Sequence, residues 1–152
     1  MSIRILAVGR KHESWVLEGI SRYEKRLHSP FLLEWVLLPH SAREGQAARL
    51  EESQRILQRL EPSDYVVLLD ETGKNIDSPT LSTLLTIQLN ASKHIVIIIG
   101  GAYGVDETIH ARADFVWSLS KLVFPHQLVR LILTEQLYRA QEITSGNPYH
   151  HL

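Results

Sequence analysis

Hydrophobic residues are grouped along the chain in five short, nearly continuous runs. Continuous apolar runs, unlike alternating ones, are typical of strands that are covered on both faces. Several of these runs end at a residue that breaks a strand, such as Gly9, Pro39 or Gly100. We predict five strands, at residues 3–9, 31–38, 65–69, 94–99 and 115–119.

The stretches between these runs have the apolar spacing expected of helices. Ser78 followed by Pro79 predicts a helix start, with Ser78 as the N-cap and Pro79 at the first helical position. The last helix has the strongest pattern, and the sequence Ser-Gly-Asn-Pro follows it at residues 145–148. We predict helices at residues 13–27, 43–60, about 78–89 and 126–144.

The alternation of strands and helices predicts an α/β fold with a mainly parallel sheet flanked by helices. The length of 152 residues fits one domain, and 44% apolar residues allow a sizeable core. The chain shows no internal repeat, low-complexity stretch or linker. We therefore interpret residues 1–152 as a single domain.

Composition and charge exclude several classes of function. The chain has no cysteine, which excludes disulfides, thiolate nucleophiles and Cys-based zinc sites. Its net charge of −1 differs from the strongly basic composition of a generic nucleic-acid coat. An RNA partner would therefore need a local basic patch or a surface assembled from two subunits. The apolar runs are too short to span a membrane, and we expect a cytoplasmic protein.

The loops after the third, fourth and fifth predicted strands contain the candidate binding residues. Ligands of parallel α/β sheets bind outside the carboxyl ends of the strands. Loops 70–74, 100–104 and 118–126 are rich in glycine or turn-forming residues, which indicates one shared small-molecule pocket. Gly100, Gly101 and Gly104 lack the spacing of a dinucleotide fingerprint, and a tight turn without a ligand remains the alternative interpretation.

Histidine and arginine provide the candidate chemical groups. His126, at the start of the last helix, could transfer a proton, contact RNA or only hydrogen-bond the helix start. Arg130 and Arg139 lie nine positions apart on that helix, so their side chains face opposite ways and cannot share one pocket of the same subunit. One arginine could face the sheet edge or a partner, and exposure to solvent is the alternative for both. No spacing of His, Asp and Glu predicts a metal site, and we expect none.

Several motifs of the last third occur together. They are IIIGGAYG at 97–104, WSLS at 117–120, FPHQLVR at 124–130, EQLYRA at 135–140 and NPYH at 147–150. Further motifs are AVGRK at 7–11, YEKR at 23–26, and LD at 69–70 with GK at 73–74. Together they resemble, over essentially the whole chain, the RlmH family of small SPOUT-class rRNA methyltransferases.

The resemblance implies a reaction, a fold and an assembly. Members of this family transfer a methyl group from S-adenosylmethionine to N3 of a pseudouridine in the large-subunit rRNA. Their second half, here about residues 65–152, forms a trefoil knot that holds the cofactor in a bent shape, and two subunits pack their knots into a homodimer. We therefore expect S-adenosylmethionine as cofactor and large-subunit rRNA within a ribosomal particle as partner, with no membrane and no metal.

The resemblance also implies site residues. Arg139, Tyr149 and His150 carry over as catalytic residues, and we add His126 as a candidate. His151 and Leu152 match nothing in the family pattern. The cofactor contacts that carry over are Leu69, Gly100, Gly101, Gly104, Leu119, Ser120, Lys121, Leu122, Val123, Phe124 and Pro125.

These residue types suit the expected chemistry. Methyl transfer from a sulfonium needs no metal but requires an aligned nucleophile. N3 of a uracil ring carries a proton, so a nearby cation or hydrogen-bond donor would favour its anion. Arg139, His126 or His150 could do this, with Arg139 first, and solvent could accept the proton. Backbone amides of Gly101 and of residues 120–124 could bind the cofactor, and we expect a Gly101→Val side chain to enter its path without changing the fold.

Two other functions remain open at this point. One is a methyltransferase of the same fold that acts on another RNA, such as tRNA. The other is a non-catalytic ribosome-associated factor, against which the intact Gly100, Gly101 and Gly104 count. The last helix is apolar on several sides, which favours a homodimer over a monomer whose N-terminal helix covers it.

Overall fold

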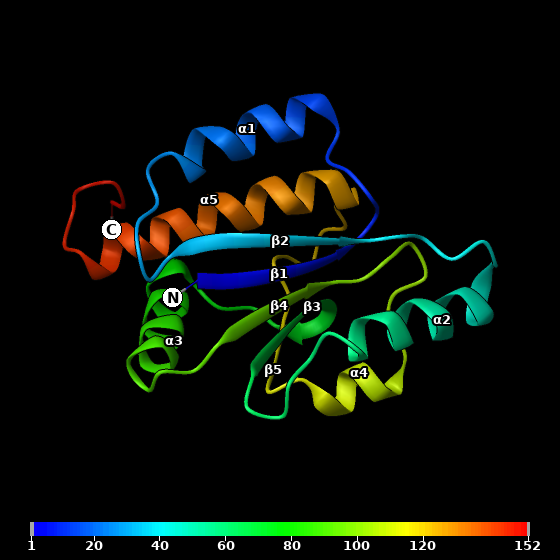
Figure 1. Ribbon diagram of the computed structural model, residues 1–152. Coiled ribbons are helices and arrows are strands. Elements are labelled where there is room, and N and C mark those ends of the chain that lie inside the picture. The colour runs from blue at the N-terminus through cyan, green and yellow to red at the C-terminus, as the bar shows by residue number, and fades with distance from the viewer. Residues whose placement is uncertain (1, 152) are drawn as a thin grey trace.

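In the computed structural model, which describes residues 2–151, a five-stranded sheet lies between two layers of helices (Figure 1). Strands and helices alternate along the chain, as the sequence predicted. The strands are β1 (Ser2–Val8), β2 (Leu32–Leu38), β3 (Tyr65–Lys74), β4 (Ile95–Ile99) and β5 (Phe115–Trp117). The helices are α1 (Ser14–Glu24), α2 (Gly45–Leu57), α3 (Ser78–Asn90), α4 (Glu107–Arg112) and α5 (His126–Thr144).

The strand order is β2-β1-β4-β3-β5, and all four neighbouring pairs are parallel. This confirms the predicted parallel sheet. Every residue of β4 is buried, because the strand lies between β1 and β3 and helices cover both of its faces. The carboxyl ends of β3, β4 and β5 therefore lie close together at one edge of the sheet.

The two faces of the sheet are covered by different helices. Ile5 of β1 faces a core that includes Leu85 of α3 and Leu133 of α5. Leu6, the next residue, faces the opposite core with Ile56 of α2. Successive side chains of a strand point to opposite faces, so both helical layers are attached to the same strands. The first helix, α1, packs on the outside of α5 (Figure 1).

The segment that joins β5 to α5 passes from one face of the sheet to the other. The chain enters β5 from α4, on the α2 side, whereas α5 packs against α3. On the way it is held by the connection between β3 and α3. Ser118 N donates to Lys74 O at 3.0 Å, and Asn75 Nδ2 donates to Ser118 O at 2.8 Å.

Three local predictions were wrong. The third strand extends to Lys74, so residues 70–74 are a strand end with an irregular register, not a loop. Helix α4 was not predicted, because its six residues are too few to show a helical period. Asp77, not Ser78, caps α3: its carboxylate accepts from Thr80 N at 2.9 Å, and Pro79 follows Ser78 inside the first turn.

The buried sides of two helices also differ from the predicted ones. Helix α2 buries Ala48, Glu52, Ser53 and Ile56, while Leu50 is 50% exposed. Helix α5 buries the stripe Arg130, Leu133, Thr134, Leu137, Tyr138, Ala140 and Gln141. Its other predicted apolar residues, among them Leu128, Leu131 and Ile132, are only half-buried. Among residues 2–151, no helix is long and apolar enough to cross a membrane.

Candidate functional site

A cavity of about 600 Å³ opens at the carboxyl ends of β3, β4 and β5. Thr72, Gly101 and Leu119 each line it, one from each of the three segments that the sequence singled out. A cavity at this edge of a parallel sheet, and of this size, is typical of a small-molecule site.

Most of the residues expected to contact the cofactor surround this cavity. Lys121 is exposed, and neither it nor Pro125 lines the cavity. His126, one of the expected catalytic residues, lies at its rim. Nothing in the sequence indicated that Arg49 of α2 and His110 of α4 would also line it. The expected residues that line the cavity are Leu69, Gly100, Gly101, Gly104, Leu119, Ser120, Leu122, Val123 and Phe124.

The glycine loop after β4 forms a tight turn over the cavity. Gly104 N donates to Gly101 O at 3.0 Å, and Gly104 has a φ of +75°, which favours glycine. A Cβ added to Gly101 would collide with Oε1 of Glu52 and would lie 3.2 Å from Val8 Cγ1. The expectation for Gly101→Val was therefore wrong in direction, because the new side chain would point under the loop, into the protein.

Helix α2 supports this loop from below. Glu52 is 4% exposed, and its Oε2 accepts from Ser41 N at 2.9 Å. Ser53 Oγ accepts from Asp106 N at 3.0 Å, which fixes the far end of the loop. Sequence analysis missed Glu52 because α2 is polar on most sides. Its spacing of four from both Ala48 and Ile56 is the signal that could have revealed a buried position.

The segment between β5 and α5 forms another wall of the cavity. Ser118 Oγ donates to Ser120 O at 2.9 Å, and Leu122 N donates to Ser120 Oγ at 3.0 Å. Beyond this turn, the side chains of Leu122 and Val123 are 72% and 81% exposed. Two such apolar side chains beside an open cavity indicate a surface that a bound molecule or a partner covers.

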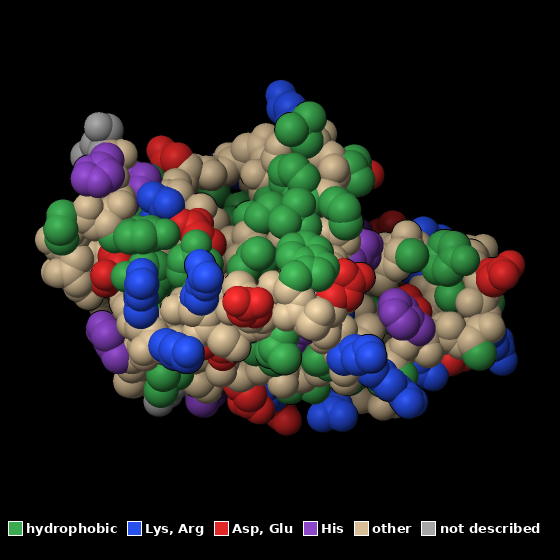
Figure 2. All heavy atoms as spheres, turned by 90° about the horizontal axis from the view of Figure 1, so that it is seen from above, with side chains coloured by type: hydrophobic (Ala, Val, Ile, Leu, Met, Phe, Trp, Pro, Cys, Tyr) green, Lys and Arg blue, Asp and Glu red, His purple; other side chains and the backbone are tan. Residues whose placement is uncertain are grey.

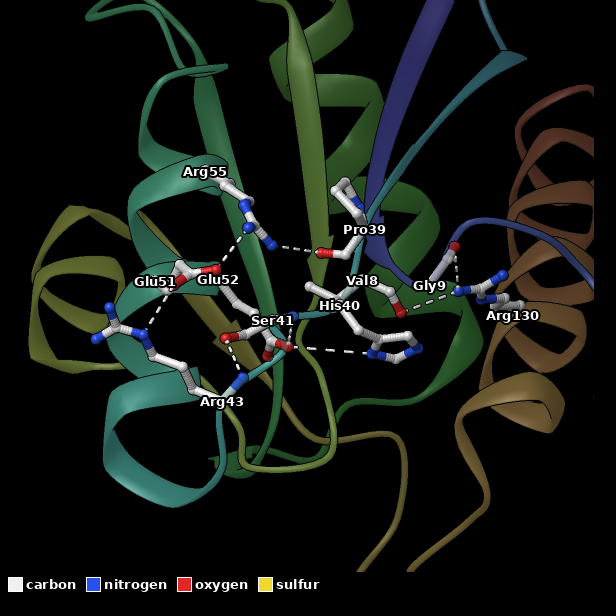
Figure 3. Close-up of polar contacts among 10 residues, drawn as sticks. All are labelled: Val8, Gly9, Pro39, His40, Ser41, Arg43, Glu51, Glu52, Arg55 and Arg130. Atoms are coloured by element: carbon white, nitrogen blue, oxygen red, sulfur yellow. Dashed lines mark hydrogen bonds and ion pairs between the residues drawn. The ribbon is translucent and has the colours of Figure 1, made fainter.

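His126 and Arg130 lie at the start of α5. Loss of solvent contact, together with the neighbouring Arg130 guanidinium, lowers the pKa of the His126 imidazole. Arg130 is 1% exposed, which contradicts the interpretation of a solvated arginine. Its guanidinium donates to Val8 O at 3.1 Å and to Gly9 O at 3.2 Å (Figure 3). It also donates to Lys11 O at 3.1 Å, and these bonds fix the loop between β1 and α1.

The other three expected catalytic residues form a cluster at the opposite end of α5. Arg139 Nη2 donates to Glu135 Oε1 at 2.6 Å, and Arg139 Nη1 lies 3.0 Å from His150 Nδ1. The Arg139 guanidinium also lies over the Tyr149 ring, 4.8 Å from its centroid. Burial and the nearby Glu135 raise the pKa of Tyr149 to about 12, so its hydroxyl stays protonated and donates to Glu135.

One subunit does not bring this cluster to the cavity. His150 borders a separate pocket with Asp77 and Gln136. Arg139 follows His126 by thirteen residues of helix, which corresponds to roughly 20 Å along the axis. The expected catalytic residues therefore lie in two places, with His126 at the cavity and Arg139, Tyr149 and His150 outside its lining.

Comparison with known proteins decides the family. The family model described as "Predicted SPOUT methyltransferase" matches residues 1–150. The chain belongs to the SPOUT methyltransferase family. Its fold is accordingly a single α/β domain with a parallel sheet and a C-terminal trefoil knot, and the crossing of residues 118–125 between the two faces fits that knot.

Relatives of this SPOUT protein match it from end to end. "Ribosomal RNA large subunit methyltransferase H" of Desulfitobacterium hafniense is 39% identical over 158 residues, which cover 99% of both chains. The protein of the same name from Gloeobacter violaceus is 41% identical over 153 residues, again 99% of both. The crystal structure of a methylase family protein from Neisseria gonorrhoeae shares the fold, with a TM-score of 0.52, 12% identity, and coverage of 99% of this chain and 85% of that one.

No group of three or more His, Asp or Glu side chains in residues 2–151 of the SPOUT domain is placed to hold a metal ion.

Proposed function

We propose that this protein is a methyltransferase that transfers a methyl group from S-adenosylmethionine to N3 of a pseudouridine in large-subunit rRNA. The observation that supports it most is that the three segments singled out by the sequence share one cavity at the carboxyl ends of the strands of a SPOUT fold. Relatives that carry the name of a large-subunit rRNA methyltransferase match over 99% of the chain and support the choice of substrate. Such a substrate would be met in the cytoplasm.

The residues around the cavity fit S-adenosylmethionine. The cofactor supplies a methyl group on a positively charged sulfur. Gly100, Gly101 and Gly104 let the main chain approach a ligand closely, and Leu119 and Phe124 offer apolar surface for an adenine ring. Leu69 of β3 completes this proposed set. Lys121 and Pro125 would act only through the shape of the segment between β5 and α5.

Glu135, Arg139, Tyr149 and His150, which we call the tail cluster, suit binding of the pseudouridine nucleotide. Its Arg139 guanidinium remains charged, because the hydrogen bonds and charge of Glu135 raise its pKa although burial lowers it. A fixed cation beside N3 would stabilise the imide anion that attacks the methyl group. His150 and Tyr149 would orient the base or a phosphate, and solvent would accept the imide proton.

The separation of the two groups of residues favours a homodimer in which each site takes its tail cluster from the partner. Helix α1 covers part of α5, yet a groove of about 470 Å³ remains between them. Leu128, Leu131 and Ile132 line it beside Trp15, which is 51% exposed, and Glu135 of the tail cluster lies at its end. Figure 2 shows hydrophobic side chains gathered on this face of the molecule.

Calorimetry with S-adenosylmethionine tests the proposal. We expect saturable binding with one site per chain, and no binding would favour a non-catalytic ribosome-associated factor. Methyl transfer to purified tRNA, with none to ribosomal particles, would instead favour a SPOUT enzyme with another RNA substrate.

A further inference from the structure

Glu52 is a buried carboxylate that the proposed reaction does not use. The residue is 4% exposed and comes from the side of α2 that faces the sheet. Its Oε2 accepts from Ser41 N at 2.9 Å, whereas its Oε1 is buried and has no hydrogen-bond partner among the described residues. Figure 3 shows this carboxylate between Ser41 and His40.

Among the described residues, the ion-pair partner of this carboxylate is a histidine, not a lysine or an arginine. His40 Nδ1 lies 4.0 Å from Oε2, and the His40 side chain is 64% exposed. The nearby arginines pair with the adjacent Glu51 instead: Arg55 of α2 at 2.6 Å, and Arg43, which precedes the helix, at 3.4 Å. Burial of a carboxylate without a close cation is unfavourable, so its presence calls for a compensating positive charge from elsewhere.

The free oxygen lies directly behind the glycine loop that lines the cavity. A Cβ built on Gly101 would collide with Oε1, and Gly101 itself lines the cavity. The glycine backbone is therefore what lies between the carboxylate and a bound molecule. Only a residue without a side chain allows this approach.

The cavity wall has an acidic excess as well. Asp70, Glu71 and Glu107 line it, against one arginine, Arg49, and two histidines, His110 and His126. Its formal charge with neutral histidines is thus negative before Glu52 is included. A cationic ligand fits this distribution better than a neutral one of the same shape.

We propose that Glu52 is a specificity-determining residue that favours the cationic sulfonium cofactor over the uncharged product, S-adenosylhomocysteine. The inference rests on the proposed function, because that function supplies the cationic ligand. The two ligands differ by one methyl group and one positive charge at sulfur. A buried carboxylate behind Gly101 attracts the charge in a region of low dielectric constant and is indifferent to the neutral thioether. The product is thereby released more readily than the cofactor.

The test compares the affinities of S-adenosylmethionine, S-adenosylhomocysteine and sinefungin, a cationic analogue with an amine in place of the methylsulfonium, by calorimetry. Glu52→Gln keeps the shape and removes the charge. We expect it to weaken both cationic ligands about tenfold, equal to about 1.4 kcal/mol, and to change S-adenosylhomocysteine less than twofold. Glu51→Gln is the matched control, because Glu51 is the neighbouring carboxylate and pairs with surface arginines; it should leave all three affinities unchanged.

If Glu52→Gln folds poorly, Glu52→Met is a second variant that removes the charge. A methionine has a similar volume, and an apolar side chain often replaces a buried charged group without loss of stability. Equal loss of all three ligands in the variants would mean that Glu52 only supports the glycine loop, and would overturn the inference. Unchanged affinities would overturn it too. Failure of the wild-type protein to bind any of the three would instead count against the proposed function.

Discussion

Arg130 is a charged residue that the fold buries without a carboxylate partner among residues 2–151. It is 1% exposed, and three main-chain carbonyls of residues 8–11 accept its hydrogen bonds. Arg130→Ala would leave these carbonyls unsatisfied and open a cavity at the start of α5. We expect the free energy of unfolding to fall by about 3 kcal/mol, measured by urea denaturation. The exposed Arg59→Ala should change it by less than about 0.5 kcal/mol. A loss at Arg130 as small as that of the control would contradict the structural role.

Arg139 and His150 lie together and away from the cofactor cavity, so their effects on binding and on reaction should separate. We expect Arg139→Ala and His150→Ala to lower methyl transfer by about 100-fold or more, because stabilisation of the imide anion is lost. Their affinity for S-adenosylmethionine, measured by calorimetry, should stay within twofold of the wild type. A parallel loss of affinity and turnover would place these residues at the cofactor instead.

At the scale of elements, α3 offers a test of capping. Hydrogen bonds from the Thr80 hydroxyl and backbone amide lower the pKa of Asp77. The cap therefore stabilises the fold fully above the unfolded-state pKa of about 3.9 and loses its effect as the pH falls through the lower folded-state value.

We expect Asp77→Ala to lower the midpoint of thermal unfolding by about 3 °C at pH 7, with the difference from wild type shrinking at pH 3. Asp77→Asn, which caps without titrating, should keep the pH 7 midpoint. A difference independent of pH would contradict the role of the carboxylate.

The elements that sequence predicts well are those with strong local patterns. All five strands were predicted because their apolar runs are continuous, and α5 was placed to the residue because its start and end signals are clear. The extension of β3 beyond Leu69 was missed, since Asp70 and Gly73 are typical of turns and the strand resumes its pairing with β5 at Lys74, after an irregular register. Local pattern contains no information about such pairing.

The candidate site was predictable where it depends on loops, and not where it depends on packing. Gly101 and Leu119 were expected at one cavity because the carboxyl ends of parallel strands meet. Glu52 is buried beneath Gly101 because of the way α2 packs on the sheet. A side chain at position 101 would point toward Glu52 for the same reason. The burial of Arg130 likewise depends on carbonyls more than a hundred positions away.

For the whole molecule, we expect a homodimer with shared sites. Light scattering at micromolar concentration should give twice the chain mass of 17.4 kDa. A cleft between subunits would bring Arg10, a cation in the exposed loop fixed by Arg130, together with Arg139 and His150 of the other chain to bind RNA. Arg10→Glu and His150→Ala should therefore each reduce methyl transfer. Mixing the two variants should restore part of the activity, because a mixed dimer retains one site with both residues intact. A fully active monomer would refute the dimer, and a dimer without restoration on mixing would refute the shared site.

The central claim, methylation of a pseudouridine in large-subunit rRNA, is tested most directly by mass spectrometry of rRNA. Ribosomes from a strain that lacks this gene are analysed before and after incubation with the purified protein and S-adenosylmethionine. The account predicts one pseudouridine without its methyl group before incubation and a mass gain of one methyl group on that nucleotide afterwards. An unchanged methylation pattern in the deletion strain, or no transfer to any ribosomal particle, would contradict it.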